Sequence, residues 1–269
     1  MMVEAIAMVR FAHYFERLEG AYSDATIKNY CSDFADFSSW CRRKRVRALP
    51  AEPQTVAAYI EASAKRLKPG TLKRRLSAIT KLHRLAGHVS PTGDEVVDLA
   101  MRRARRAQPS RPQQALGITA ERRDRLLAAC GGNLSGLRDK VMITVGFDSL
   151  CRRSELVALR IEDFTQGPDG TYAVLVRRAK NDQHGEGRIA RLSIATSRLV
   201  DQWCKVMGSK HGPLLRPVYG DVVGTRFLHP SIVGATLKRI SKIAGYLPDE
   251  TASVSGHSLR VGAAQTLTV

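Results

Sequence analysis

The sequence predicts a mainly α-helical protein with an N-terminal helical bundle followed by an α+β domain that contains a small antiparallel sheet. The first half spaces its apolar residues at intervals of three and four, which is typical of amphipathic helices. The second half contains two β-rich segments separated by a polar loop. Between the halves lies a polar stretch with two prolines and no apolar periodicity. These observations predict domains at residues 1–107 and 118–269, joined by a linker at 108–117.

Four helices are expected in the first domain. Ser23 or Asp24 can cap a helix that continues to about residue 45, where a basic cluster ends it. Prolines interrupt the chain at residues 49–53. Further helices are expected at 55–67, from residue 71 to about 85, and at about 94–106.

The second domain is expected to mix helices with two strands. A turn at Asp169 and Gly170 precedes a strand at 171–177, and a polar loop at 181–187 leads to a second strand at 188–194. Helices are expected at 119–130, 137–147, 153–159, 196–207 and 231–244, and another begins at residue 258.

The charge of the chain indicates a polyanionic partner. The 269 residues include 43 Lys and Arg against 25 Asp and Glu, a net charge of +18 that both halves share. Nucleic acid is the simplest partner for such an excess. A membrane is disfavoured because the longest apolar run, residues 141–147, is far shorter than the roughly 20 residues that span a bilayer.

The cysteines and the N-terminus suggest a location. The five cysteines form no Cys-x-x-Cys pair, and the N-terminus lacks the features of a signal peptide. We therefore expect a protein of the bacterial or phage-infected cytoplasm, associated with the nucleoid.

Three polar patterns in the second half could carry chemistry. Arg152 and Glu155 follow the apolar helix and share a face, a basic segment at 177–180 ends the first strand, and His257 and Arg260 lie one turn apart after Gly256. Each pattern alone has an ordinary structural explanation, such as a surface ion pair or solvated charges at a sheet edge.

Taken together, the three patterns supply what phosphodiester chemistry needs. Guanidinium groups bind phosphate oxygens in pairs and stabilise the charge of the transition state. A lysine or histidine moves a proton to or from the bridging oxygen. Paired carboxylates that could hold Mg²⁺ are not evident, so we expect no metal and no cofactor. A metal-free transfer requires a protein nucleophile, normally Ser or Tyr.

The motifs Cys-Arg-Arg-Ser-Glu-Leu, the hairpin lysine and Gly-His-Ser-Leu-Arg resemble those of the tyrosine recombinases, the phage integrase family. The segments AYSDAT, SSWCR, PAEP and KLHRLAG in the first half resemble the family's DNA-clasping helical domain in the same order. The resemblance covers about residues 20–269. It implies that residues 1–107 are a core-DNA-binding domain and that residues 118–269 are a catalytic domain.

The resemblance also implies a role for each motif residue. Arg152 and Arg260 would hold the scissile phosphate, and Glu155 would orient this cluster. Lys180 would protonate the departing 5′ oxygen, while His257 would assist proton transfer. The complete protein would cleave and rejoin DNA without a metal, through a 3′-phosphotyrosine.

One part of the family pattern is absent from the sequence. The nucleophilic tyrosine of the family follows the His-x-x-Arg motif, but none of the seven tyrosines follows Arg260. We therefore expect a C-terminal truncation, engineered or natural, and a chain that binds its DNA site without cleaving it. The alternative is a non-catalytic, sequence-specific DNA-binding protein derived from a recombinase. An RNA-binding protein is a third class, disfavoured because 6% aromatic residues provide few stacking platforms.

DNA contacts are expected from basic residues on three helices. Most of them should contact phosphates, and one or two should reach base edges. The resemblance implies that the two domains clamp one half-site of an inverted-repeat duplex, as a homodimer on two half-sites and a tetramer in the full-length protein. The candidate residues are Arg42, Arg43, Lys44, Lys73, Arg74, Arg75, Lys81 and Arg84 in the first domain, and Lys238, Arg239 and Lys242 in the second.

Overall fold

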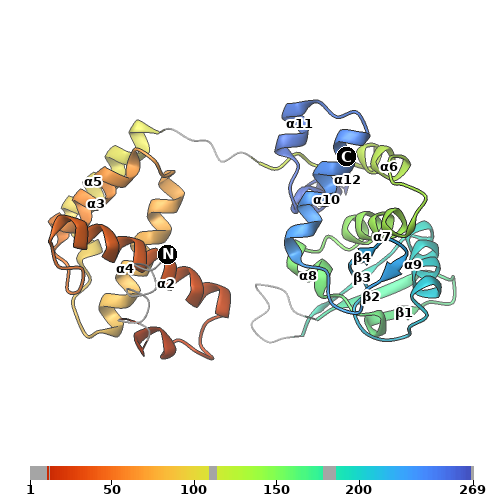
Figure 1. The fold of residues 1–269 in the computed structure, drawn as a ribbon, viewed down its shortest axis with the longest axis horizontal. Coiled ribbons are helices and arrows are strands. Elements are labelled where there is room, and N and C mark those ends of the chain that lie inside the picture. The colour runs from red at the N-terminus through yellow and green to blue at the C-terminus, as the bar shows by residue number, and fades with distance from the viewer. Residues whose placement is uncertain (1–10, 12, 109–113, 178–185, 268–269) are drawn as a thin grey trace. The chain divides into compact units, whose positions relative to one another are not determined.

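The computed structural model describes residues 11, 13–108, 114–177 and 186–267 (Figure 1). The chain divides into two compact units, residues 1–112 and 113–269, and each has its own hydrophobic core. The predicted fold class is confirmed, because the described part of the first unit is helical and the second unit combines helices with a three-stranded antiparallel sheet. No helix in the described ranges is long and apolar enough to cross a membrane.

The helices of the first unit begin where the sequence offers caps. The Ser23 side chain accepts a hydrogen bond from the backbone N–H of Thr26, and Asp94 accepts one from Val96. Proline opens the other two α-helices, where its missing N–H costs nothing. The helices are α2 (Asp24–Lys44), α3 (Pro53–Ala64), α4 (Pro69–Leu85), a 3₁₀ turn (Pro91–Gly93) and α5 (Glu95–Ala107).

Aromatic and aliphatic side chains from α2, α3, α4 and α5 contribute to the core of the first unit. Phe37 of α2 and Tyr59 of α3 meet edge to face with their ring centroids 5.1 Å apart. His83 of α4 is fully buried, and its ring is bonded on both sides: Nε2 accepts from the backbone N–H of Ala51 at 2.9 Å, and Nδ1 lies 2.8 Å from the Ile79 carbonyl oxygen. These bonds tie the loop before α3 to α4.

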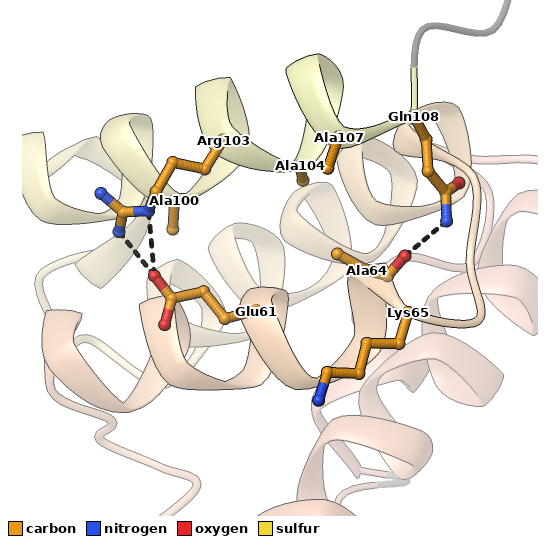
Figure 2. Close-up of a pocket in the computed structure, with 8 residues that line it drawn as sticks. All are labelled: Glu61, Ala64, Lys65, Ala100, Arg103, Ala104, Ala107 and Gln108. Atoms are coloured by element: carbon orange, nitrogen blue, oxygen red, sulfur yellow. Dashed lines mark hydrogen bonds and ion pairs between the residues drawn. The ribbon is translucent and has the colours of Figure 1, made fainter.

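The α3 and α5 helices pack closely through small side chains (Figure 2). Two polar contacts also link them: Arg103 pairs with Glu61 at 2.5 Å, and the Gln108 side-chain amide donates to the Ala64 carbonyl oxygen at 2.7 Å. Between these contacts lies a groove of about 340 Å³ whose lining includes Ala64, Ala100, Ala104 and Ala107.

The second unit contains more elements than the sequence predicts. The strands expected near residues 171–177 and 188–194 are present, but β1, the β4–β5 hairpin and α11 were not expected. The elements are α6 (Ala120–Ala128), α7 (Leu134–Asp148), α8 (Arg153–Ala158), a 3₁₀ turn (Ile161–Asp163), β1 (Phe164–Gln166), β2 (Tyr172–Val176), β3 (Arg188–Arg191), α9 (Ile194–Met207), β4 (Val218–Tyr219), β5 (Val222–Val223), α10 (Pro230–Ile243), α11 (Pro248–Ser253) and α12 (Ser258–Leu267).

The three-stranded sheet has the order β1-β2-β3, and all neighbours are antiparallel. Val174 in the central strand lies opposite Phe164 on one side and Ala190 on the other. The second predicted strand, at 188–194, is wrong at its end, because α9 begins at Ile194. Ser193 is the cap that ends the strand: its hydroxyl accepts from the Thr196 N–H and donates to the Asp148 carboxylate.

Helix α7 lies at the centre of the second unit. It contacts α6, α8, α9 and α12 (Figure 1), and it is apolar around most of its circumference, as expected for a buried helix. Val141, Met142, Ile143 and Val145 are fully buried. Elements that lie far apart in the sequence are therefore held against one helix.

Candidate nucleic-acid interface

The first part of the candidate site is the turn between α7 and α8. Leu150, between α7 and α8, has a positive φ of 50°. Glu155 then folds back onto Arg152: one carboxylate oxygen accepts from the Arg152 backbone N–H at 2.9 Å, and the other accepts from the guanidinium at 2.7 Å. The Arg152 side chain is 25% exposed and the Glu155 side chain 5%. Glu155 thus fixes an arginine whose guanidinium still reaches solvent.

The ionisation of Glu155 follows from these bonds. Burial acts to raise the pKa of the carboxyl, but the hydrogen bonds from Arg152 outweigh burial and hold the pKa of Glu155 below its usual range. The carboxylate is therefore charged at neutral pH and holds the guanidinium by charge as well as by geometry.

The second part of the site is the start of α12, which lies against α8. A Cβ on Gly256 would lie 2.6 Å from Cδ of Arg153, so the loop before α12 touches the first residue of α8. Deeper in the unit, a Cβ on Gly146 of α7 would meet both Leu156 of α8 and Leu259 of α12. These close approaches bring the Arg152–Glu155 and His257–Arg260 segments together, which the sequence alone did not establish.

His257 and Arg260 face an open cavity. His257 is exposed and Arg260 is half-buried. The cavity has a volume of about 510 Å³, and Gln114, Val261, Ala264 and Gln265 also line it. Among the described residues no carboxylate pairs with Arg260. Its charge is thus available to an anion.

The strands that precede and follow the predicted hairpin lysine are anchored to the same region. Lys180 itself lies outside the described residues. Arg177, at the end of β2, pairs with the buried carboxylate of Asp163. Arg188 of β3 donates to the Ser149 carbonyl oxygen at 2.6 Å and lies 3.7 Å from the sulfur of Cys151, directly before Arg152.

Tyr246, the tyrosine nearest in sequence to the His-x-x-Arg motif, has a packing role. It is 7% exposed, its hydroxyl donates to the Arg122 carbonyl oxygen at 3.2 Å, and the Arg125 guanidinium lies 4.9 Å from its ring centroid. Burial raises the pKa of Tyr246, which opposes formation of a phenolate.

Most predicted DNA-binding residues of the first unit lie at the surface. Arg42, Arg43 and Lys44 are exposed in the last turn of α2, and Lys73 and Arg84 are exposed on α4. Lys81 is half-buried and donates to the Tyr22 hydroxyl at 2.7 Å.

The neighbouring arginines Arg74 and Arg75 differ from each other. Arg75 is 14% exposed, and its guanidinium bonds to the Asp36 carboxylate and to the Tyr59 hydroxyl. Arg74 is 49% exposed, and it pairs at 3.0 Å with Asp33, whose side chain is 4% exposed. Arg75 therefore holds α4 to α2 and α3, whereas Arg74 keeps a solvent-facing side.

The predicted residues of α10 are also exposed. Arg239 reaches back to the Asp139 carboxylate of α7 at 2.5 Å, and Arg138 donates to the other oxygen of that carboxylate at 2.7 Å. Lys238 and Lys242 have no acidic partner among the described residues. Within the same ranges no group of three or more His, Cys, Asp or Glu side chains is placed to hold a metal ion.

Of the buried carboxylates that hold these arginines, sequence reasoning identified Glu155 but not the other three. Four acidic side chains are buried in the described residues, namely Asp33, Asp139, Glu155 and Asp163. Each pairs with at least one arginine. The available signal was an acidic residue within an apolar stripe, as where Asp33 precedes Phe34 on the buried face of α2.

Comparison with known proteins agrees with this geometry. Residues 9–88 match the N-terminal SAM-like domain of phage integrases. The chain is 35% identical over 257 residues to an integrase/recombinase XerD homolog of Selenomonas ruminantium, across 91% of this chain and 74% of that protein. It is 27% identical over 267 residues to the recombinase Cre of Escherichia phage P1, across 92% and 77% of the two chains.

Solved structures share the fold. A lambda integrase dimer bound to a COC′ core site matches with a TM-score of 0.62 at 17% identity, covering 95% of this chain and 68% of that one. XerH site-specific recombinase bound to a palindromic difH substrate matches with a TM-score of 0.61 at 17% identity, covering 90% and 68%. The chain belongs to the tyrosine recombinase (phage integrase) family.

Proposed function

We propose that this chain is a site-specific DNA recombinase of the tyrosine type, with residues 1–107 and 118–269 as its DNA-binding and catalytic domains. The observation that carries the proposal is the contact of the α12 entry with α8, through Gly256 and Arg153. This contact supports the proposal that the Arg152–Glu155 pair acts together with His257 and Arg260 in one cationic site.

The site is suited to a phosphodiester. Arg152 and Arg260 would bind the non-bridging oxygens of the scissile phosphate and stabilise the additional negative charge of the transition state. Glu155 would keep Arg152 in place. His257 would assist proton transfer, and Lys180 would protonate the departing 5′ oxygen.

The partner is duplex DNA. The recombinases of similar fold include a lambda integrase dimer on a core site and a lambda integrase tetramer on a Holliday junction. By analogy, we propose that this chain binds an inverted repeat as a homodimer and that the complete recombination assembly is a tetramer. With roughly 6–10 phosphate contacts per chain, affinity should fall about 10³–10⁵-fold between 50 and 200 mM salt.

We further propose that the 269-residue chain holds its site without a covalent bond. Tyr59, Tyr172 and Tyr246 are tied by hydrogen bonds to neighbouring groups. Tyr219 is 63% exposed, but it lies in the β4–β5 hairpin, outside the three motifs. A nicked suicide substrate tests this: a covalent protein–DNA adduct would refute non-covalent binding, and a Tyr219→Phe variant would then show whether Tyr219 is the nucleophile.

The phosphate site itself can be tested by neutralising phosphates one at a time. The bound duplex is first selected from random DNA, and an inverted repeat is expected. A methylphosphonate, which lacks the phosphate charge, is then moved along the centre of the site. One substitution should weaken binding by the wild-type chain but not by an Arg152→Ala/Arg260→Ala variant.

The outcomes separate the alternatives. Arg198→Ala removes an exposed arginine on α9 that belongs to none of the motifs, and it should leave the methylphosphonate profile unchanged. A profile that is flat for the wild-type chain would refute the phosphate site and favour the non-catalytic DNA-binding protein. Equal affinity for RNA and DNA, or no selected sequence, would refute the recombinase proposal.

A further inference from the structure

We propose that Arg74 determines base specificity by binding a guanine in the major groove, and that Asp33 and Asn29 of α2 are the positioning residues that hold it there. This inference rests on the proposed function, since it requires that α4 faces duplex DNA. It assigns different roles to two adjacent arginines that the sequence treats alike.

The guanidinium of Arg74 is held from behind by α2. Nη2 lies 3.0 Å from the Asp33 carboxylate, and Nη1 donates to the Asn29 side-chain oxygen at 3.3 Å. Asn29 and Asp33 are one turn apart on α2, so they present their acceptors on the same face. A guanidinium carries five N–H donors. These two contacts leave at least three N–H groups of an approximately half-exposed side chain for a ligand.

Asp33 belongs to a network of polar side chains from three helices. The carboxylate is almost wholly buried between α2 and α4, and Arg75 lies 3.9 Å from the same oxygen. Arg75 is fixed in turn by Asp36 and by the Tyr59 hydroxyl, which donates to Asp36 at 2.7 Å. Arg74 therefore projects from a network of three helices and loses little conformational freedom on binding.

The charge around Arg74 favours a base over a phosphate. A phosphate that approached the guanidinium would also face the negative carboxylate directly behind it, and this repulsion offsets part of the attraction. The proposed site at Arg152 differs, because Arg260 there has no carboxylate partner among the described residues, whereas Arg75 beside Arg74 is paired with Asp36. The O6 and N7 atoms of guanine are neutral acceptors, so they accept the N–H groups without that repulsion. Two N–H groups in a fixed plane match the O6 and N7 pair, which is the commonest specific contact of arginine with DNA.

The other cations of α4 differ in these respects. Lys73 and Arg84 are exposed and have no acidic partner among the described residues, which suits phosphate contacts. The Arg75 guanidinium is occupied within the protein. Arg74 differs from the other cations of α4 discussed here because its guanidinium is about half exposed, is held by Asn29 and is paired with a buried carboxylate.

The test compares base preference with salt dependence. Duplexes are selected from random DNA with the wild-type chain, and affinities are then measured for single base-pair changes at several salt concentrations. The wild-type chain should prefer G·C at one position of each half-site by about 5-fold to about 150-fold. Arg74→Ala should abolish that preference, Arg74→Lys should reduce it because an ammonium lacks the planar pair of N–H groups, and both should leave the other positions unchanged.

Substitutions of the positioning residues should change base preference and salt dependence in a way that unfolding of the chain would not. Asp33→Asn removes the charge behind Arg74, so the preference for guanine should fall while affinity for unrelated duplexes rises and the salt slope steepens by up to about 0.9. Asn29→Ala, at an exposed position that leaves the fold intact, should reduce the same preference to a smaller degree. The matched control Lys73→Ala should weaken binding to all sequences alike.

Two outcomes would overturn the inference. In the first, Arg74→Ala keeps every base preference of the wild-type chain. In the second, Arg74→Ala weakens binding to all sequences equally and has a shallower salt slope, which would make Arg74 a phosphate contact. An Asp33→Asn variant with wild-type preference and salt slope would remove Asp33 from the positioning role. A wild-type chain that selects no duplex would instead refute the proposed function, so the two failures are distinguishable.

Discussion

Gly146 of α7 lies between the leucines that neighbour Glu155 and Arg260, and a larger residue there should disturb both halves of the proposed phosphate site. A Cβ at this position would lie 2.7 Å from Cδ1 of Leu259 and 3.0 Å from Cδ2 of Leu156. Apolar carbons pack at about 3.5–4.0 Å, so the two methyl groups would retreat by at least about 0.8 Å and about 0.5 Å. Both leucines are at most 2% exposed and have no solvent to move into.

The expected cost of Gly146→Ala follows from two opposed terms. Overpacking a buried site costs about 1–3 kcal/mol, while alanine gains about 1 kcal/mol over glycine within a helix. The net loss of unfolding free energy should be about 0–2 kcal/mol, measured by urea denaturation. Because Leu156 and Leu259 belong to α8 and α12, their displacement should shift both helices. The loss of affinity caused by the methylphosphonate should then also become smaller.

A matched substitution separates packing from helix propensity. Gly70 lies in the first turn of α4, and no atom lies within 4 Å of its Cβ position. Gly70→Ala should therefore stabilise the chain by about 0.5–1 kcal/mol. If Gly146→Ala stabilised the chain equally and kept the methylphosphonate effect, the role assigned to α7 would be refuted.

Three further substitutions test single contacts. Burial lowers the pKa of His83, so its contribution to stability is present above the unfolded pKa near 6.5 and is lost as the pH falls. Urea denaturation between pH 8 and pH 5 should therefore show a smaller decrease in unfolding free energy for His83→Gln than for the wild-type chain. The pKa of Glu155 is also lowered, so its contribution to stability is present above about 4.5 and is lost as the pH falls through the lowered pKa. By the same assay, Glu155→Gln should cost about 1–3 kcal/mol at pH 7 and progressively less as the pH falls below about 4.5, and a cost that does not change with pH would contradict the ion pair. Trp203→Phe removes a buried N–H that donates to the Leu214 carbonyl oxygen at 2.7 Å, and a thermal melt should show a loss of about 2–4 kcal/mol; a melt like that of the wild-type chain would contradict this.

The sequence predicts the longer elements well because periodicity and caps are local properties. Ser23 caps α2 as expected, and α5 begins at Glu95, within one residue of the expected start. The β4–β5 hairpin was not predicted, because two-residue strands are too short to show alternation. The helix α11 was also not expected; its six residues are too few for an apolar stripe to emerge.

The sequence predicts a set of residues for the candidate site, but it does not predict which of them lie close together in the fold. Arg152, Glu155, His257 and Arg260 follow from motifs, whereas their proximity depends on glycines that let backbones approach across the fold. The ion pair of Asp33 could not be predicted, because the sequence does not distinguish a buried aspartate from a solvent-exposed one. Its partners, Arg74 and Arg75, lie on another helix, and only tertiary packing selects them.

The burial of Asp33, Asp139, Glu155 and Asp163 has a consequence for how the protein responds to ionic strength. Dissolved ions screen exposed charges strongly but buried pairs much less. Added salt should therefore weaken the attraction of this chain to a DNA backbone while the paired arginines keep their orientation. Affinity would then vary steeply with salt, and the order in which the chain prefers one sequence over another would remain the same.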